Sequence, residues 1–310
     1  MLQAYKTQCK LMGSDFELCI VDTNQNKAQK FLDKGVLEIK RIENLLTEFS
    51  EDSITSKINA NAGISSIKIP EEVFQLLQRC QNLSKLSSGY FDITVGPLKQ
   101  LYRFKNTEFD FPSNKNIRST LKKVGFNHLI LEPNESSVFL DKEGMHLSFA
   151  AIGKGYAADR IKKLWQSQGI SSGYINASGD LTAFGYNIDG KLWKIGISNP
   201  DDSQQTLLYL PLQNACVATS GDYEQHFIHN NTKYSHNINP KSGLPIKGIK
   251  SVTVISPSAE LSDALATAVY AMGTQKGLDF VNQLPQTHAI IIDEKNNVSF
   301  SKYLEYESVH

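Results

Sequence analysis

Apolar residues recur at three- and four-residue steps in several parts of this chain, which is the spacing of an amphipathic helix. The longest such run covers residues 27–49, with seven apolar side chains from Leu32 to Phe49 at this spacing. A second helix is predicted to begin after Pro70, which suits the N-terminus of a helix, and to end near Gly89. Similar patterns predict helices at about residues 155–168 and 261–268.

Short apolar or alternating runs predict strands between these helices. They fall at residues 16–21, 127–131, 137–140, 173–177, 191–197, 206–212, 215–219, 251–255 and 288–292. Because strands often follow one another directly, the pattern favours an α+β fold with mostly antiparallel sheets and packed helices over regular βαβ alternation. No long linker rich in Pro, Gly or Ser divides the chain, so we expect one domain over residues 1–310, with the polar stretch 105–116 as a surface excursion.

Composition narrows the classes of function. The chain of 310 residues has 32 basic and 32 acidic side chains, so no overall field draws it to nucleic acid or to an anionic membrane. No apolar run has membrane-spanning length, and residues 1–10 lack the apolar core of a secretory signal. We therefore expect a cytoplasmic protein, or an exported one if a leader has been trimmed. The four cysteines form no CxxC pair and predict neither a zinc site nor a disulfide framework.

Asp263 and Thr267 stand four residues apart in the helix predicted around residues 261–268. At this spacing a carboxylate and a hydroxyl project from one face of the helix, here among small apolar residues. Mg²⁺ would satisfy both groups, because it takes oxygen ligands and is often shared with a substrate phosphate. Taken alone, however, an Asp four residues before a Thr is more often a solvated or capping pair.

Two further segments carry reactive side chains without a unique interpretation. Lys154 lies between two glycines just before a predicted helix, where backbone N–H groups can hold a phosphate. The spacing is not that of a Walker A loop, and a helix entry with glycines for close packing explains it equally well. His236 lies on a predicted strand that leads into a Pro/Gly turn, where a lone histidine is more often structural than catalytic.

Five short segments nevertheless occur together in one order along the chain. They are FDITVGPL at residues 91–98, IGKGYA at 152–157, VATSGDY at 217–223, SHNINPKSG at 235–243 and SDALAT at 262–267. In this order they resemble the ApbE family, flavin transferases that attach FMN from FAD to proteins. The resemblance extends from about Met12-Gly13 to at least Gly273, and it implies an ApbE-like, T-fold-like domain.

The resemblance implies a Mg²⁺-dependent FAD:protein FMN transferase. Mg²⁺ is expected on Asp263 and Thr267, helped by a backbone carbonyl near Ala151, where it bridges to the FAD diphosphate and helps AMP leave. The implied partner is an acceptor flavoprotein whose Thr or Ser hydroxyl attacks the FMN phosphorus, and His236 is the candidate base for its proton. The candidates for binding FAD are Met12, Phe49, Tyr90, Phe91, Asp92, Lys154, Thr219, Ser220 and Asp222.

Two other functions stay open at this point. In an FAD pyrophosphatase, water replaces the acceptor hydroxyl and the products are FMN and AMP; an aromatic side chain near Phe49 would favour transfer by holding FAD. A flavin-binding protein without turnover is the third possibility, although pure binding would not need a base beside a metal. The chain also departs from the commonest family pattern, with Asn239 and Ser148 where Asp is usual and Ser178 in place of a Gly.

Overall fold

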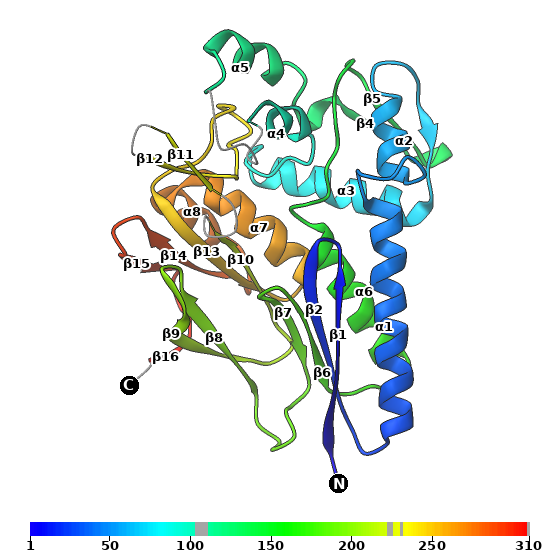
Figure 1. Ribbon diagram of the computed structural model, residues 1–310, viewed down its shortest axis with the longest axis vertical. Helices are drawn as coiled ribbons and strands as arrows, with labels where there is room; N and C mark the ends of the chain where they lie inside the picture. Colours follow the sequence, from blue (N-terminus) through cyan, green and yellow to red (C-terminus); the bar gives the residue numbers. More distant parts are fainter. Residues whose placement is uncertain (103–110, 222–225, 230–231, 309–310) are drawn as a thin grey trace.

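The computed structural model describes residues 1–102, 111–221, 226–229 and 232–308 (Figure 1). Its centre is an eight-stranded sheet with the strand order β1-β2-β6-β7-β10-β13-β14-β15. Every pair of described strands is antiparallel, which confirms the predicted α+β class. The strands of this sheet are β1 (Gln3–Leu11), β2 (Ser14–Asp22), β6 (Gly173–Ala177), β7 (Asp180–Phe184), β10 (Cys216–Gly221), β13 (Ile249–Ser256), β14 (His288–Asp293) and β15 (Val298–Phe300).

Alternation of side chains along the strands gives the central sheet two covered faces. On β2, Phe16 and Leu18 pack toward the helices, whereas Cys19, the residue after Leu18, faces the other side and packs against a second sheet. The helical layer consists of α1 (Gln25–Leu46), α6 (Gly153–Ser167), α7 (Ala259–Met272) and α8 (Thr274–Val281). The other face packs on a three-stranded sheet of β8 (Trp193–Asn199), β9 (Asp202–Leu212) and β16 (Glu307–Ser308) (Figure 1).

A second group of elements lies at one end of the molecule, at the top of Figure 1. Its apolar core joins the C-terminal part of α1 to a small three-stranded sheet and also contains residues of α6 and α7. The elements are α2 (Ile54–Ala60), β3 (Ile67–Lys68), α3 (Glu71–Leu86), α4 (Gly96–Tyr102), α5 (Asn114–Leu121), β4 (Leu129–Glu132) and β5 (Ser137–Leu140), with 3₁₀ turns at Phe126–His128 and Pro133–Glu135. A hairpin of β11 (His226–His229) and β12 (Thr232–Ser235) also lies near this end.

Differences from the predicted elements occur mainly at edges and turns. The apolar pattern missed β1, whose side chains alternate only between exposed and half-buried at the sheet edge. The first helix ends at Leu46 rather than near residue 49, because Thr47 has extended backbone angles (φ −60°, ψ 143°). Between β6 and β7 the turn consists of Ser178 and Gly179, which both have positive φ, and Asp180 is already the first residue of β7.

Two further features of the structure concern the cysteines and the helices. Cys19 and Cys80 are fully buried free thiols, as expected for cysteines that pack as small apolar side chains. Within the described ranges, no helix combines the length and the apolar character that crossing a bilayer requires. The division of the chain into one domain over residues 1–310 stays a prediction.

Candidate functional site

The candidate metal pair lies on α7, which has a well-formed N-terminus. The Ser258 hydroxyl accepts a hydrogen bond from Leu261 N, as an N-cap residue does. Asp263 follows and is only 6% exposed, and Thr267 is half-buried one turn later. Oδ2 of Asp263 accepts a hydrogen bond of 3.1 Å from the backbone N–H of Gly155, near the start of α6. The metal candidate on α7 is therefore in direct contact with the glycine-flanked helix entry.

Strand β10 brings one more candidate, Ser220, to the same place. The hydroxyl oxygens of Ser220 and Thr267 are 3.4 Å apart, so the end of β10 lies beside α7. The preceding residue, Thr219, places its hydroxyl 2.8 Å from that of Thr253 on β13. Its backbone N–H donates to Oδ1 of Asp180 over 2.9 Å. The structure therefore places the Ser220 hydroxyl beside α7, whereas the Thr219 hydroxyl pairs with β13 on the other face of the strand and only the Thr219 backbone reaches Asp180.

Lys154 is connected to this group through an ion pair. Its Nζ lies 2.6 Å from Oδ2 of Asp180, and the two side chains are 19% and 10% exposed. Because Asp180 also accepts the Thr219 N–H, one carboxylate links the start of α6 to β10. Asp180 was not among the predicted site residues; the available signal was an acid directly after Ser178-Gly179.

We expect the Lys154–Asp180 pair to contribute measurably to folding stability. A double-mutant cycle with Lys154→Met and Asp180→Asn, measured by urea unfolding, should give a coupling free energy of about 1–3 kcal/mol, because both side chains are largely buried. The Lys194–Glu307 pair is the matched control, since its side chains are 51% and 54% exposed. Its coupling should stay below about 1 kcal/mol. Equal coupling in the two pairs would refute the structural role of Asp180.

The loop before α6 carries Ala151 and is held by hydrogen bonds. Two backbone N–H groups at its end donate to Phe149 O, and the Ser148 hydroxyl donates to Oε1 of Glu48 over 3.0 Å. Burial raises the pKa of Glu48, but hydrogen bonds from His146 and Ser148 outweigh it and leave this pKa below its usual range. Glu48 therefore supplies a carboxylate beside Ser148, the position where Asp is more usual in the family pattern.

Met12 and Tyr90 are two of the candidates for binding FAD, and each has identified neighbours. Met12 lies in the β1–β2 turn with a φ of 53°, and a Cβ built on Gly153 would lie 3.3 Å from Cε of Met12. This methionine is therefore close to the first residue of α6. Tyr90 is half-buried, its hydroxyl accepts a hydrogen bond of 3.1 Å from Lys276, and Nζ of Lys241 lies 4.8 Å from the centre of its ring.

The remaining candidates do not join this group in the same way. Phe49 is 92% exposed on the segment after α1. Phe91 is 1% exposed in the apolar core, so the structure does not bring its ring to a ligand surface. Asp92 is buried, which raises its pKa. Its carboxylate accepts hydrogen bonds from Thr94 and from the backbone N–H of Phe126. Asp222 lies outside the described residues.

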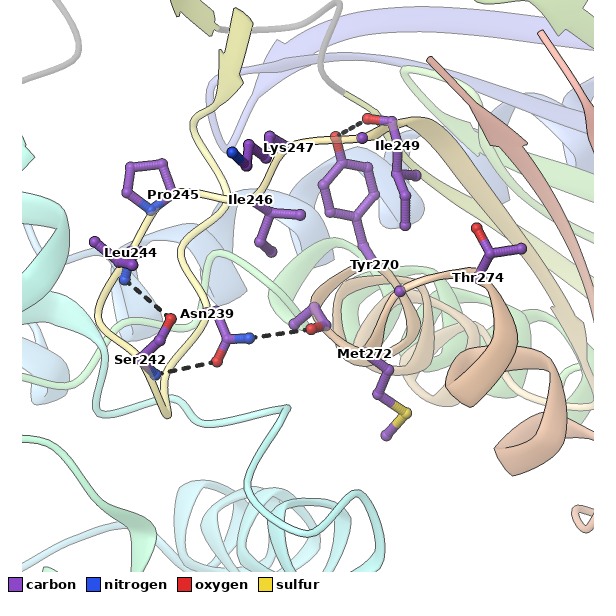
Figure 2. Close-up of a pocket in the computed structure, with 13 residues that line it drawn as sticks. Asn239, Ser242, Leu244, Pro245, Ile246, Lys247, Ile249, Tyr270, Met272 and Thr274 are labelled. Atoms are coloured by element: carbon purple, nitrogen blue, oxygen red, sulfur yellow. Dashed lines mark hydrogen bonds between the residues drawn. The ribbon is translucent and has the colours of Figure 1, made fainter. Parts of the chain in front are cut away.

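His236 directly follows β12 and is half-buried. The turn after it is tied to the C-terminal end of α7, because Nδ2 of Asn239 donates to Ala271 O over 3.2 Å while Oδ1 accepts from Ser242 N (Figure 2). A cavity of about 410 Å³ lies between this turn and the end of α7. The chain therefore places the segment after His236 against the helix that carries Asp263.

The donor atoms of the site suit one kind of cation better than others. Among the described residues, no three His, Cys, Asp or Glu side chains gather as a metal centre. Asp263 and Thr267, one turn apart on α7, offer a carboxylate and a hydroxyl, which are oxygen donors with a single negative charge. Mg²⁺ is commonly held in this way, because it keeps few protein ligands and completes its shell with water and substrate phosphates. The residues present therefore fit Mg²⁺ together with a diphosphate.

Known proteins resemble this chain both in sequence and in fold. The model of the ApbE family matches residues 12–292. The FAD:protein FMN transferase of Klebsiella pneumoniae (strain 342) is 30% identical over 301 residues, which cover 96% of this chain and 92% of that protein. The ApbE protein of Thermotoga maritima superposes with a TM-score of 0.90 at 28% identity, over 97% of both chains. The flavinyl transferase ApbE of Pseudomonas stutzeri, in its apo form, gives 0.86 at 27% identity, over 97% of this chain and 95% of that one.

The fold and these relatives together place the protein among transferase enzymes with this antiparallel α+β architecture. The chain belongs to the ApbE family. The resemblance found in the five ordered segments is confirmed over most of the chain.

Proposed function

We propose that this protein is an FAD:protein FMN transferase that depends on Mg²⁺ and releases AMP. The observation that carries the proposal is the meeting of Asp263, Thr267 and Ser220 with the start of α6, where oxygen donors and backbone N–H groups converge. Support also comes from the relatives named for this activity, one of which matches this chain over nearly its whole length.

In the proposed reaction, a Thr or Ser hydroxyl of an acceptor flavoprotein attacks the phosphorus of the FMN half of FAD. A new P–O bond to the acceptor forms as the bridging P–O bond of the diphosphate breaks, and AMP leaves with the bonding electron pair. His236 takes the proton of the attacking hydroxyl. Lys154, Thr219 and Ser220 bind the diphosphate and hold it in line with that hydroxyl.

Asp263 and Thr267 hold Mg²⁺, with the backbone carbonyl near Ala151 as a third protein oxygen. When bound, Mg²⁺ supplies positive charge against the phosphate oxygens, which lowers the cost of charge developing there. The hydrogen bond from Gly155 N fixes one carboxylate oxygen of Asp263 before any ligand arrives. A carboxylate fixed in advance loses less conformational freedom when the cation binds.

The direct test is to incubate the protein with FAD and Mg²⁺, with and without an acceptor flavoprotein that carries a flavinylation Thr. We expect AMP to appear with the acceptor, together with a fluorescent acceptor band in a denaturing gel. Incubation with EDTA should remove both signals, since the diphosphate is then left without its cation.

The same test separates the other two functions. AMP formed equally without an acceptor would indicate FAD pyrophosphatase activity, in which water is the nucleophile. Tight FAD binding with no AMP under any condition would indicate a binding protein and would contradict both enzymatic proposals. If AMP is released at the same rate with and without Mg²⁺, only the assignment of the metal is contradicted.

A further inference from the structure

Helix α6 supplies a carboxylate to the N-terminus of α7, its neighbour in the helical layer (Figure 1). Asp159, on the second turn of α6, accepts hydrogen bonds from the backbone N–H groups of Ala259 at 3.0 Å and Glu260 at 2.9 Å. It also accepts the hydroxyl proton of Ser258, the N-cap residue of α7, at 2.8 Å. The first backbone donors of α7 are therefore satisfied by a charged group from another helix, which also suits the helix dipole.

Helix α7 in turn provides a carboxylate that accepts a backbone N–H near the N-terminus of α6. One turn after its start, Asp263 accepts the backbone N–H of Gly155, near the N-terminus of α6. The two helices approach so closely here that a Cβ built on Gly155 would lie 2.3 Å from Ala259 O. Each helix thus provides an aspartate that accepts N–H groups at the beginning of the other, and only a glycine at position 155 allows this distance.

We propose that Asp159 is a positioning residue for Asp263 and Thr267, an inference that rests on the proposed function of that pair as the Mg²⁺ site. Asp159 contacts neither the cation donors nor the cleft oxygens in the described structure, and it acts through the backbone of α7. Its three hydrogen bonds fix the rotation and the axial position of the first turn of α7 relative to α6. Asp263 follows one turn later on the same helix. The position of the first turn relative to α6 therefore also determines where the Asp263 carboxylate lies.

The expected consequence is an effect on metal affinity rather than on the chemical step. Without Asp159, the first turn of α7 loses its acceptors and can rotate or fray, so the donors on α7 no longer match the loop at Ala151. Groups that orient metal ligands from outside the coordination shell typically change metal affinity by about 10–100-fold when they are removed. Saturating Mg²⁺ should then restore most of the turnover.

The test compares Mn²⁺ binding to the FAD-loaded wild-type protein and to its Asp159→Ala variant by electron paramagnetic resonance of free Mn²⁺. We expect the dissociation constant to rise about tenfold or more in the variant, while metal-free FAD binding and the far-UV circular dichroism stay unchanged. Asp159→Asn should lie between the two, because its amide oxygen still accepts one N–H. Gly155→Ala, which forces the helices apart from the other side, should weaken Mn²⁺ binding as well.

Asp22→Ala is the matched control. Asp22 also accepts a backbone N–H ahead of a helix, from Asn24 at 2.9 Å, but at the start of α1. This variant should keep the wild-type Mn²⁺ affinity; the same loss in Asp22→Ala would reduce the effect to general destabilisation and overturn the inference.

Wild-type Mn²⁺ affinity in a folded Asp159→Ala variant would also overturn it. If that variant does not fold, the affinity of Asp159→Asn decides in the same way. The proposed function is tested separately, by AMP release and acceptor labelling in the wild type. Absence of these products with intact Mn²⁺ binding would refute the transferase but leave the positioning role in place, whereas a wild type that binds no Mn²⁺ would overturn both.

Discussion

Replacement of Asp263 by alanine is expected to abolish Mg²⁺-dependent transfer, with kcat/KM falling by at least about 10³-fold, or about 4 kcal/mol of transition-state stabilisation. Asp263 is the only carboxylate in the proposed donor set, and the remaining hydroxyl and carbonyl oxygens carry no negative charge. The carboxylate is also held in place by Gly155 N, so its removal takes away a preformed ligand. The measurement is the rate of AMP release and of acceptor labelling over a range of Mg²⁺ concentrations.

Two further variants distinguish loss of charge from loss of structure. Asp263→Asn keeps the size of the side chain and an oxygen that can accept the Gly155 N–H, yet it should be almost as inactive as the alanine variant. Glu260→Gln is the control on the same helix, because Glu260 is equally buried but pairs with Arg79 at 2.6 Å. It should retain activity within about threefold. Normal Mg²⁺-dependent activity in Asp263→Asn would refute the assignment of this carboxylate to the metal.

Replacement of His236 by alanine should lower kcat by about 10²–10⁴-fold, which is the usual contribution of a general base. FAD affinity should change by less than about threefold, because the proposed role of the imidazole begins only when the acceptor hydroxyl arrives. Stopped-flow or quenched measurements of AMP release at saturating acceptor, together with fluorescence titration of FAD, separate these two quantities.

His288→Ala is the matched control, since this histidine lies on β14 and its Nδ1 faces the carbonyl oxygen of Lys302 at 3.2 Å. It should have wild-type kcat and KM. A fully active His236→Ala enzyme would remove this histidine from the role of base. A variant with unchanged kcat but weakened FAD binding would instead move His236 to the binding surface.

Much of the fold could be predicted from local patterns. A helix or strand that buries one face repeats its apolar residues with its own period, and this repeat can be recognised in the sequence. The helix after Pro70 and the strands that became β13 and β14 follow directly from apolar spacing. The edge strand β1 could not be found in this way, since its residues remain exposed or half-buried and carry little apolar alternation. The helix α2 is short, with two buried residues, and gives an equally weak signal.

The candidate site was predictable only in part, for a related reason. Asp263 and Thr267 could be paired by spacing alone, because four residues make about one turn of any helix. Asp180 could not be assigned, since its two partners come from α6 and β10 and nothing in the local sequence of a turn reveals them. Phe91 was predicted as a binding residue because it is an aromatic residue within a motif. Its burial in the core could be known only from the structure.

The sequence by itself determined the family, the antiparallel α+β class and the pairing of Asp263 with Thr267, because each depends on order and spacing along the chain. Only the tertiary structure decided what these residues contact. Ser148 meets Glu48 across 100 residues, Asp159 meets the start of α7, and Gly155 meets Asp263 across 108. Such contacts arise from the packing of helices and strands that are distant in sequence, and neither spacing nor residue type specifies which distant partners meet.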